Sequence, residues 1–378
     1  MRARQRFLPM VHGGLALALV LLLQACASKD KPKPTALEPA PSLVKVTEQW
    51  RANVGATGLP LQAHVLRSQV LVASTQGDVA AFEARSGKEI WRASLATALS
   101  AGVGSDGETA AVVSRENQLI ALRAGKEVWR QKMPSLTLTP PLVAGGRVFI
   151  QSADRTVSAF DASTGRSLWV QKRSGDALVL GQPGILMAVG DTLVSGQSGR
   201  LLGLNPQNGA TRWDASVAVG RGVNEVERLV DLVSGVSRVG DTLCLRAFQS
   251  AVACVDAQVG RTLWTKTASG SSGIAGNEST MFGAEADGKL IAWRKSDGEK
   301  LWSSEKLRFR GLSSPVFVAG SVVVGDFEGF LHFISPQDGT LLARVPSDGS
   351  AIALAPVWVD ETLVAVTTRG AVIGFRPE

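Results

Sequence analysis

Asp161-Ala-Ser-Thr-Gly165-Arg-Ser-Leu-Trp169 has the form of a strand end, a tight turn at Gly165, and the start of a second strand that carries Trp169. A glycine followed four residues later by a tryptophan recurs along the chain. The pairs are Gly87/Trp91, Gly125/Trp129, Gly165/Trp169, Gly209/Trp213, Gly260/Trp264 and Gly298/Trp302. A seventh copy, which begins at Gly339, has Ala343 in place of the tryptophan, and Trp50 stands alone before the first copy.

The spacing of this motif predicts the fold. Counting Trp50 and Ala343, successive positions are 41, 38, 40, 44, 51, 38 and 41 residues apart. A period near 40 residues, with four short strands in each period, is typical of a β-propeller. Seven of the nine tryptophans occupy this one position, so we interpret them as structural residues that seal one blade against the next. They are Trp50, Trp91, Trp129, Trp169, Trp213, Trp264 and Trp302.

Apolar runs within each repeat support this prediction. Val70–Ala73, Val148–Ile150 and Leu363–Val366 are continuously apolar and do not alternate with polar residues. A strand with this pattern belongs to a sheet that is covered on both faces. A blade between two other blades is such a sheet.

The two ends of the chain predict the number of blades. The last repeat supplies three strands and stops near Phe375, without a tryptophan strand. The segment Lys45–Trp50 is a tryptophan strand with nothing before it. Joining the two ends completes an eighth blade and removes an open sheet edge. We therefore expect an all-β, eight-bladed propeller of four-stranded antiparallel blades over residues 45–378, with 45–51 paired beside 370–376.

Residues 1–25 have the features of a secretory signal peptide. Arg2, Arg4 and Arg6 precede an apolar run from Leu15 to Leu23. The run ends in Leu23-Gln24-Ala25-Cys26, which resembles the lipobox of bacterial lipoproteins. That resemblance predicts a covalent lipid on Cys26, whereas the alternative is an ordinary signal peptide with a chance cysteine.

Residues 26–44 are expected to be a tether. They are rich in proline and lysine and have few apolar side chains, a composition that does not form a core by itself. At about 3.1 Å per residue, a Pro-rich tether would place the propeller roughly 50 Å or less from the membrane. Ala27 follows the cysteine where an inner-membrane retention signal would have Asp, so we expect the outer membrane, with the protein facing the periplasm.

Charge and chemistry argue against nucleic-acid binding and catalysis. The formal net charge is +7, and it is +4 without the three arginines of the signal segment, with no basic cluster or aromatic-basic stripe. The histidines are His12, His64 and His332, and they make neither a metal-ligand spacing nor a catalytic triad. Glu225 and Glu227 are interpreted as a solvated loop face. We expect no metal, no cofactor and no enzymatic activity.

Cys244 and Cys254 flank a turn and face each other across a predicted hairpin. A disulfide is compatible with the periplasm. Two free, packed thiols are the alternative, because bridges between adjacent strands are geometrically demanding.

Two connections between blades are longer than the others, Gln171–Gly184 and Ser216–Gly235. Both join an outer tryptophan strand to the inner strand of the next blade. Such connections emerge on one side of a propeller, and these two belong to neighbouring blades. Insertions collected on one side often mark a binding surface.

The repeat Ala-x-Asp-x-x-x-Gly-x-x-x-Trp, at Ala159 to Trp169, resembles that of the PQQ-type quinoprotein propellers. Enzymes of that family hold pyrroloquinoline quinone and calcium and carry an adjacent cysteine pair, which this chain lacks. The repeat therefore implies the fold and not the activity. A degenerate quinoprotein-type dehydrogenase is kept as an alternative function.

With its lipobox, tether and length, the whole chain looks like a propeller lipoprotein of the outer-membrane β-barrel assembly machinery. The resemblance rests also on the segment Val323–His332. It implies binding to BamA through a Leu-x-Leu-Arg stretch and an Arg-Leu-x-Asp-x-Asp stretch in neighbouring loops. The matching residues are Leu178, Leu180, Arg228 and Asp231; Gly181 replaces the first arginine and Val233 the last aspartate.

The resemblance thus implies a non-enzymatic scaffold that binds BamA and other machinery components and assists insertion of outer-membrane β-barrel proteins. Unfolded outer-membrane proteins are a further candidate partner. A periplasmic interaction propeller with another partner is the remaining alternative.

Overall fold

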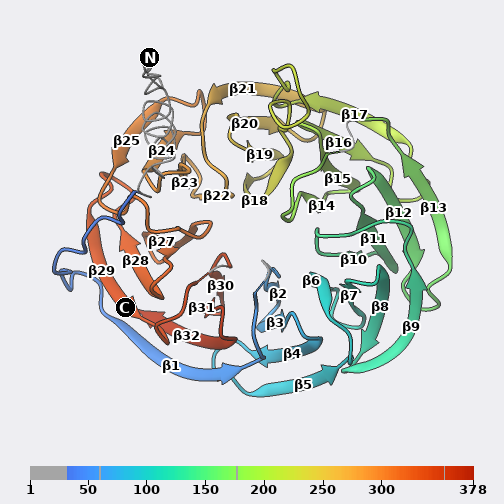
Figure 1. Cartoon of the computed structure of the whole chain (residues 1–378), viewed down its shortest axis with the longest axis horizontal. Helices are drawn as coiled ribbons and strands as arrows, with labels where there is room; N and C mark the ends of the chain where they lie inside the picture. The colour runs from blue at the N-terminus through green and yellow to red at the C-terminus, as the bar shows by residue number, and fades with distance from the viewer. Residues whose placement is uncertain (1–31, 59–60, 176–177, 353) are drawn as a thin grey trace, which may run out of the picture. The chain divides into compact units, whose positions relative to one another are not determined.

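Eight four-stranded antiparallel sheets stand around a common axis, and each sheet runs from an inner strand near the axis to an outer strand at the rim (Figure 1). The computed structural model describes residues 32–58, 61–175, 178–352 and 354–378. Residues 35–378 form one compact unit. Among the described residues there is no helix long and apolar enough to cross a membrane.

The blades follow the chain, four strands at a time. Blade 1 comprises β2 (His64–Leu66), β3 (Gln69–Ala73), β4 (Asp78–Glu83) and β5 (Glu89–Ser94). Blade 2 comprises β6 (Leu99–Ser105), β7 (Ala110–Ser114), β8 (Gln118–Arg123) and β9 (Lys126–Lys132). Blade 3 comprises β10 (Leu142–Ala144), β11 (Arg147–Gln151), β12 (Thr156–Asp161) and β13 (Ser167–Lys172). Blade 4 comprises β14 (Leu186–Val189), β15 (Thr192–Gln197), β16 (Arg200–Leu204) and β17 (Thr211–Ser216).

The second half of the ring repeats this order. Blade 5 comprises β18 (Leu232–Val239), β19 (Thr242–Ala247), β20 (Ala251–Asp256) and β21 (Arg261–Thr267). Blade 6 comprises β22 (Ile274–Gly276), β23 (Thr280–Ala284), β24 (Leu290–Arg294) and β25 (Lys300–Ser304). Blade 7 comprises β26 (Val316–Val318), β27 (Ser321–Gly325), β28 (Phe330–Ile334) and β29 (Leu341–Pro346). Blade 8 comprises β30 (Val357–Val359), β31 (Thr362–Val366), β32 (Ala371–Pro377) and β1 (Val46–Asn53).

The ring closes where the two ends of the chain meet in blade 8. β1 pairs antiparallel with β32, from Val46 opposite Pro377 to Asn53 opposite Ala371. The prediction of eight four-stranded blades closed by the N-terminal strand is confirmed. The unpaired tryptophan strand and the three strands of the last repeat therefore form one blade.

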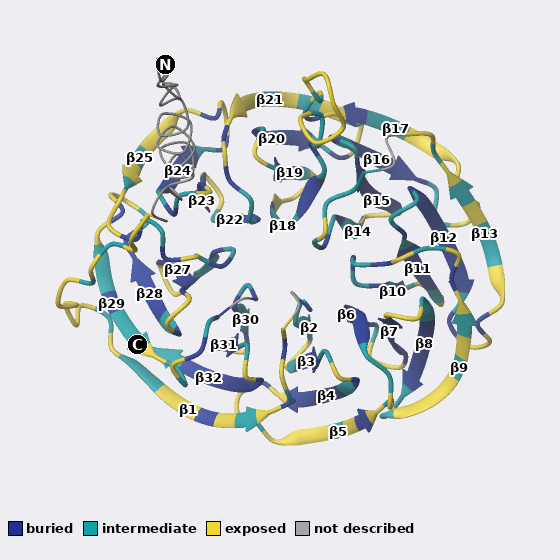
Figure 2. Ribbon diagram, in the orientation of Figure 1, coloured by how far each residue is buried: buried dark blue, intermediate teal, exposed yellow. Residues whose placement is uncertain are grey.

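The core lies between the blades, because each sheet is covered on both faces. All five residues of β7 and all five of β31 are buried, without alternation. Outer strands such as β13 alternate between half-buried and exposed residues. Figure 2 shows the second and third strands of the blades mostly buried, between half-buried strands near the axis and a more exposed outer rim.

Each blade tryptophan contacts the turn of the next blade. Trp129 donates from Nε1 to the Ala162 carbonyl at 2.9 Å, and a Cβ added at Gly165 would lie 2.7 Å from the Trp129 ring. Gly165 has a φ of 72°, a region that glycine enters without steric cost. Four other tryptophans make the same hydrogen bond: Trp50 to Ala84, Trp169 to Pro206, Trp264 to Lys295 and Trp302 to Pro336. The glycine of one repeat is thus the partner of the preceding repeat's tryptophan.

A small residue lies opposite each tryptophan in the neighbouring strand of its own blade. Trp169 is opposite Ala159, and Trp213 is opposite Gly203. In blade 7 the sizes are exchanged, because Ala343 is opposite Phe333. The volume missing from the outer strand is supplied by its neighbour.

Cys244 and Cys254 are joined by a disulfide across β19 and β20, where they lie directly opposite each other. Both are fully buried. Of the two alternatives left open by the sequence, the structure therefore contains the bridge.

Part of the expected tether lies on the propeller. The amide of Thr35 donates to the Arg308 carbonyl at 3.0 Å, and the amide of Leu43 donates to the Leu342 carbonyl at 3.0 Å. Leu37 packs against an apolar cluster of blades 6 and 7. This differs from the expectation of an undocked segment through residue 44. The reason is that a single leucine and backbone hydrogen bonds suffice where a prepared surface exists.

Candidate docking site on the long connections

The two long connections lie on the same side of the ring. They are residues 173–185, between β13 and β14, and residues 217–231, between β17 and β18. Strands alternate in direction within every blade, so all connections from a fourth strand to the next first strand emerge on one side. We call this side the loop side. Blades 3, 4 and 5 are neighbours, which brings these two connections together.

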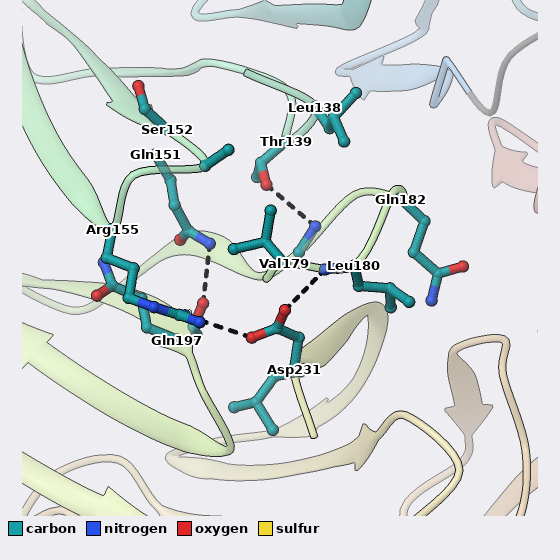
Figure 3. Close-up of a pocket in the computed structure, with 14 residues that line it drawn as sticks. Leu138, Thr139, Gln151, Ser152, Arg155, Val179, Leu180, Gln182, Gln197 and Asp231 are labelled. Atoms are coloured by element: carbon teal, nitrogen blue, oxygen red, sulfur yellow. Dashed lines mark hydrogen bonds and ion pairs between the residues drawn. The ribbon is translucent and has the colours of Figure 1, made fainter. Parts of the chain in front are cut away.

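The carboxylate of Asp231 joins the two connections (Figure 3). Its Oδ2 accepts a hydrogen bond from the Leu180 amide at 2.9 Å, and its Oδ1 accepts one from the Ser198 amide at 3.1 Å. Nη1 of Arg155 lies 3.5 Å from the same carboxylate, and the two side chains are only 8% and 15% exposed. Because the ion pair is sheltered from water and supported by backbone amides, it fixes the relative positions of three segments.

Arg155 extends this network to the first connection. Its Nη2 donates to the Leu178 carbonyl at 3.2 Å. Nearby, the Gly184 amide donates to Thr139 Oγ1 at 3.0 Å. Residues 178–184 are therefore held at one end by Arg155 of blade 3 and at the other by Thr139, in the connection that leads into blade 3. The sequence offered no signal for Arg155, which lies in an ordinary turn between two strands.

Leu178 and Leu180 are half-buried, as is Val179 between them. Val179 and Leu180 line a small hollow together with Arg155, Asp231 and other polar groups. The leucines are thus neither fully exposed anchors nor fully buried core residues. The side chain of each leucine is partly covered by protein and partly open to solvent.

Arg228 is also half-buried, at the base of a projecting tip formed by residues 221–227. The tip is ordered by Glu227, whose carboxylate accepts hydrogen bonds from the Val223 amide and from Asn224 Nδ2, both at 2.9 Å. Glu227 therefore caps its own loop, in keeping with its interpretation as part of a loop face. On this tip Val223 is 91% exposed and Val226 72% exposed. These exposed valines were missed because isolated apolar residues in a polar loop give no periodic signal.

The two departures from the family motif lie in different surroundings. Gly181 is exposed, and no atom lies within 4 Å of the position that a Cβ would occupy. Val233 is 2% exposed in β18, opposite Arg246. Residue 181 therefore lies on an open surface, where an arginine side chain would have room. Residue 233 instead lies inside a sheet, where the valine is part of the buried core.

The remaining titratable groups singled out in the sequence have structural surroundings. His332 Nε2 lies 2.9 Å from Asp326 Oδ2, both residues are fully buried, and burial lowers the pKa of His332. Burial alone would raise the pKa of Asp326, but hydrogen bonds from His332 and the Phe330 amide hold it below the usual value. Burial lowers the pKa of His64, whose Nε2 contacts the Ser105 carbonyl. No group of three or more His, Cys, Asp or Glu residues suited to a metal occurs among the described residues. Cys26 lies outside the described residues.

Comparison with known proteins gives a consistent result. A family model described as outer membrane protein assembly factor BamB matches residues 75–304. The assembly factor BamB of Burkholderia pseudomallei is 37% identical over 95% of this chain and 96% of its own length. That of Bordetella pertussis is 33% identical over 97% of both chains.

Solved structures show the same relationship. The crystal structure of BamB from Moraxella catarrhalis superimposes with a TM-score of 0.79 at 25% identity, covering 88% of this chain and all of that one. A quinohemoprotein alcohol dehydrogenase from Comamonas testosteroni shares the fold with a TM-score of 0.67 at 15% identity, covering 87% of this chain and 76% of that one.

The eight blades and the Gly-x-x-x-Trp contact between them define a propeller of the PQQ-repeat class. Within that class, the chain belongs to the BamB family of outer membrane protein assembly factors. The resemblance drawn from the repeat and the lipobox is therefore confirmed at the level of the family. Because the family consists of assembly factors, the interpretation as a non-enzymatic protein stands and the dehydrogenase alternative falls.

Proposed function

We propose that this assembly factor acts as a scaffold that docks on BamA through the two long connections of the loop side. Membership of the BamB family gives the broader role, outer membrane protein assembly within the Bam complex. The proposed contact residues are Leu178, Leu180, Arg228 and Asp231. The observation that supports this proposal is the Asp231 carboxylate, which holds both connections in one arrangement.

The four residues would have different roles. Leu178 and Leu180 supply an apolar anchor, and Arg228 supplies a polar rim, the usual anatomy of a binding hot spot. Asp231 acts as a positioning residue, because its oxygens are already engaged by Leu180, Ser198 and Arg155. A rigid loop loses little conformational entropy on binding.

A binding measurement with the periplasmic domains of BamA tests this assignment. Leu180→Ala and Arg228→Glu should each weaken binding by about 1–3 kcal/mol, the range of a moderate hot spot. Leu301→Ala is the matched control, since Leu301 is 44% exposed on the outer strand β25 of blade 6, outside the blades that carry the two connections. It should leave the affinity unchanged.

Thermal unfolding of the same variants separates docking from stability. Leu180 is half-buried, so its truncation should cost less than the about 2–5 kcal/mol of a fully buried leucine. If a folded Leu178/Leu180/Arg228 triple variant keeps wild-type affinity, the proposed site is wrong. Affinity purification from native membranes would then identify another partner.

The proposal includes a membrane anchor at the N-terminus. Residues 1–25 would be the signal peptide, Cys26 the lipidated residue, and 26–44 the segment that leads to the propeller at 45–378, which faces the periplasm from the outer membrane. Labelling with radioactive palmitate should mark the wild type and not Cys26→Ala. Equal labelling of both would contradict the anchor.

A further inference from the structure

The segment 35–43, which we call the strap, has a defined path along the rim of blades 6 and 7. It begins at Thr35, whose amide and carbonyl both contact the connection between β25 and β26. It ends at Leu43, whose amide bonds to Leu342 at the start of β29. In Figure 1 the chain before β1 runs outside β29.

A buried network prepares the surface that receives Thr35. Arg310 is 3% exposed and donates from Nη1 to the Thr35 carbonyl at 3.1 Å. Its other nitrogens engage Asp326 and Glu328. Asp326 in turn pairs with His332, as described above. The guanidinium is thus fixed by the blade before it holds the strap.

Two further contacts hold the middle of the strap. Arg344 donates to the Glu38 carbonyl at 2.8 Å. Leu37 packs against a cluster that includes Leu307, Ile334 and Leu341. The exposed pair Lys306–Glu38 adds little, because surface ion pairs are screened by water.

The topology gives the strap a direction. The contacts of Thr35 lie on the connection between a fourth strand and the next first strand, and therefore on the loop side. Leu342 lies at the beginning of a fourth strand, on the opposite side. The strap therefore enters the propeller on the loop side and crosses the rim before β1 begins.

We propose that the strap orients the propeller on the membrane. The loop side, at the rim of blades 6 and 7, would face the lipid surface. This inference rests on the proposed lipid anchor at Cys26. Thr35 is nine positions after Cys26, a chain length of roughly 30 Å at about 3.1 Å per residue, instead of the roughly 50 Å expected for an undocked tether. The long connections would then meet their partner on the side of the propeller that faces the membrane.

Energy transfer to labelled lipid headgroups tests the orientation. Val223 is 91% exposed on the loop side, and Val259 is 59% exposed in the turn between β20 and β21 on the opposite side. Lipidated full-length protein, with a donor dye at Val223→Cys or at Val259→Cys, is placed on vesicles of phosphatidylethanolamine and phosphatidylglycerol that carry acceptor-labelled headgroups. We expect higher transfer efficiency from residue 223. Equal transfer, or higher transfer from residue 259, would overturn the inference.

A substitution in the strap tests whether the strap causes the difference in transfer efficiency. Leu37→Asp should expel the strap, and the two transfer efficiencies should become equal while the propeller still unfolds at the wild-type temperature. Leu43→Asp is the matched control, because Leu43 is 72% exposed, and it should keep the wild-type difference. An unchanged difference in Leu37→Asp would show that the strap does not set the orientation.

Hydrogen exchange measures the strap without any membrane. The Thr35 amide should exchange slowly in wild type and in Leu43→Asp, and fast in Leu37→Asp. Fast exchange in wild type would contradict the docked strap. A protein that fails to attach to vesicles but protects Thr35 would instead contradict the lipid anchor, so the two failures are distinct.

Discussion

The blade interfaces sealed by tryptophan and the one that contains Ala343 solve the same packing problem in different ways. Where a tryptophan is present, the next blade offers a turn glycine beneath the ring. Ala343 faces blade 8, whose third and fourth strands, β32 and β1, come from opposite ends of the propeller sequence and are joined by no turn. Without that turn the tryptophan has no partner. The motif is therefore a contact between two repeats and not a property of a single repeat.

The interior of blade 7 accommodates this change. Phe333 and Ala343 lie opposite each other, and both are buried. Phe375 of blade 8 belongs to the same apolar cluster. Conserving the total volume of a core keeps its density when individual side chains change size.

The largest effect is expected from removing a tryptophan seal at the ring closure. Trp50 is 8% exposed, lies opposite Gly374, and donates to the Ala84 carbonyl at 2.8 Å. Trp50→Ala should lower the free energy of unfolding by about 3–5 kcal/mol, measured by urea denaturation, because it leaves a cavity and an unpaired carbonyl. A loss below about 1 kcal/mol would show that the ring closes without this seal.

A tryptophan restored at residue 343 should be harmful. Ala343→Trp places a large ring opposite Phe333, and overpacking typically costs about 1–3 kcal/mol. Adding Phe333→Ala to Ala343→Trp should recover part of the loss, with a coupling energy of about 1 kcal/mol or more in a double-mutant cycle. Additive effects of the two substitutions would refute the exchange of volumes.

Two glycine substitutions separate the tryptophan contact from backbone strain. Gly165 and Gly145 both have positive φ, 72° and 58°, but only Gly165 lies under a tryptophan; no atom lies within 4 Å of a Cβ placed at Gly145. Gly145→Ala should cost about 1 kcal/mol from backbone strain. Gly165→Ala should cost about 1–2 kcal/mol more, since its methyl group would displace Trp129. Equal unfolding midpoints for the two variants would show that backbone strain alone accounts for the loss of stability in Gly165→Ala.

The smallest effect is expected from the ion pair that joins the chain ends. Lys45 Nζ lies 2.6 Å from Glu378 Oε2, but these side chains are 69% and 50% exposed. Lys45→Ala should change the free energy of unfolding by less than about 1 kcal/mol, with the remainder sensitive to salt. A larger, salt-independent loss would show that this exposed ion pair contributes substantially to closure of the ring.

Periodic features of the fold could be predicted because every repeat places the same residue types at the same packing positions. Trp129 and Gly165 belong to different blades, yet their common period revealed the ring before any contact was known. The ends of the chain revealed the eighth blade because an unpaired strand edge is unfavourable. For the candidate site, spacing located the two long connections, since an insertion changes the period.

Other features depend on contacts that have no period. Asp231 was expected in the partner contact, but its role in joining the Leu180 and Ser198 amides arises from two loops that are distant in sequence. Arg155 belongs to this network and carries no motif. Composition indicated that residues 35–43 form no core by themselves. They dock because blades 6 and 7 present an apolar surface to Leu37 and Arg310 binds the Thr35 carbonyl.

The all-β class, the eight blades and the closure by the N-terminal strand could be predicted because they follow from local patterns that repeat along the chain. The family could be predicted from the same repeat together with the lipobox and the tether. Three contacts emerged only from the folded structure: each blade tryptophan lies on the turn glycine of the next blade, Cys244 and Cys254 are bridged, and the strap crosses the rim. The physical reason is that such contacts depend on the three-dimensional position of single side chains, which local patterns do not encode.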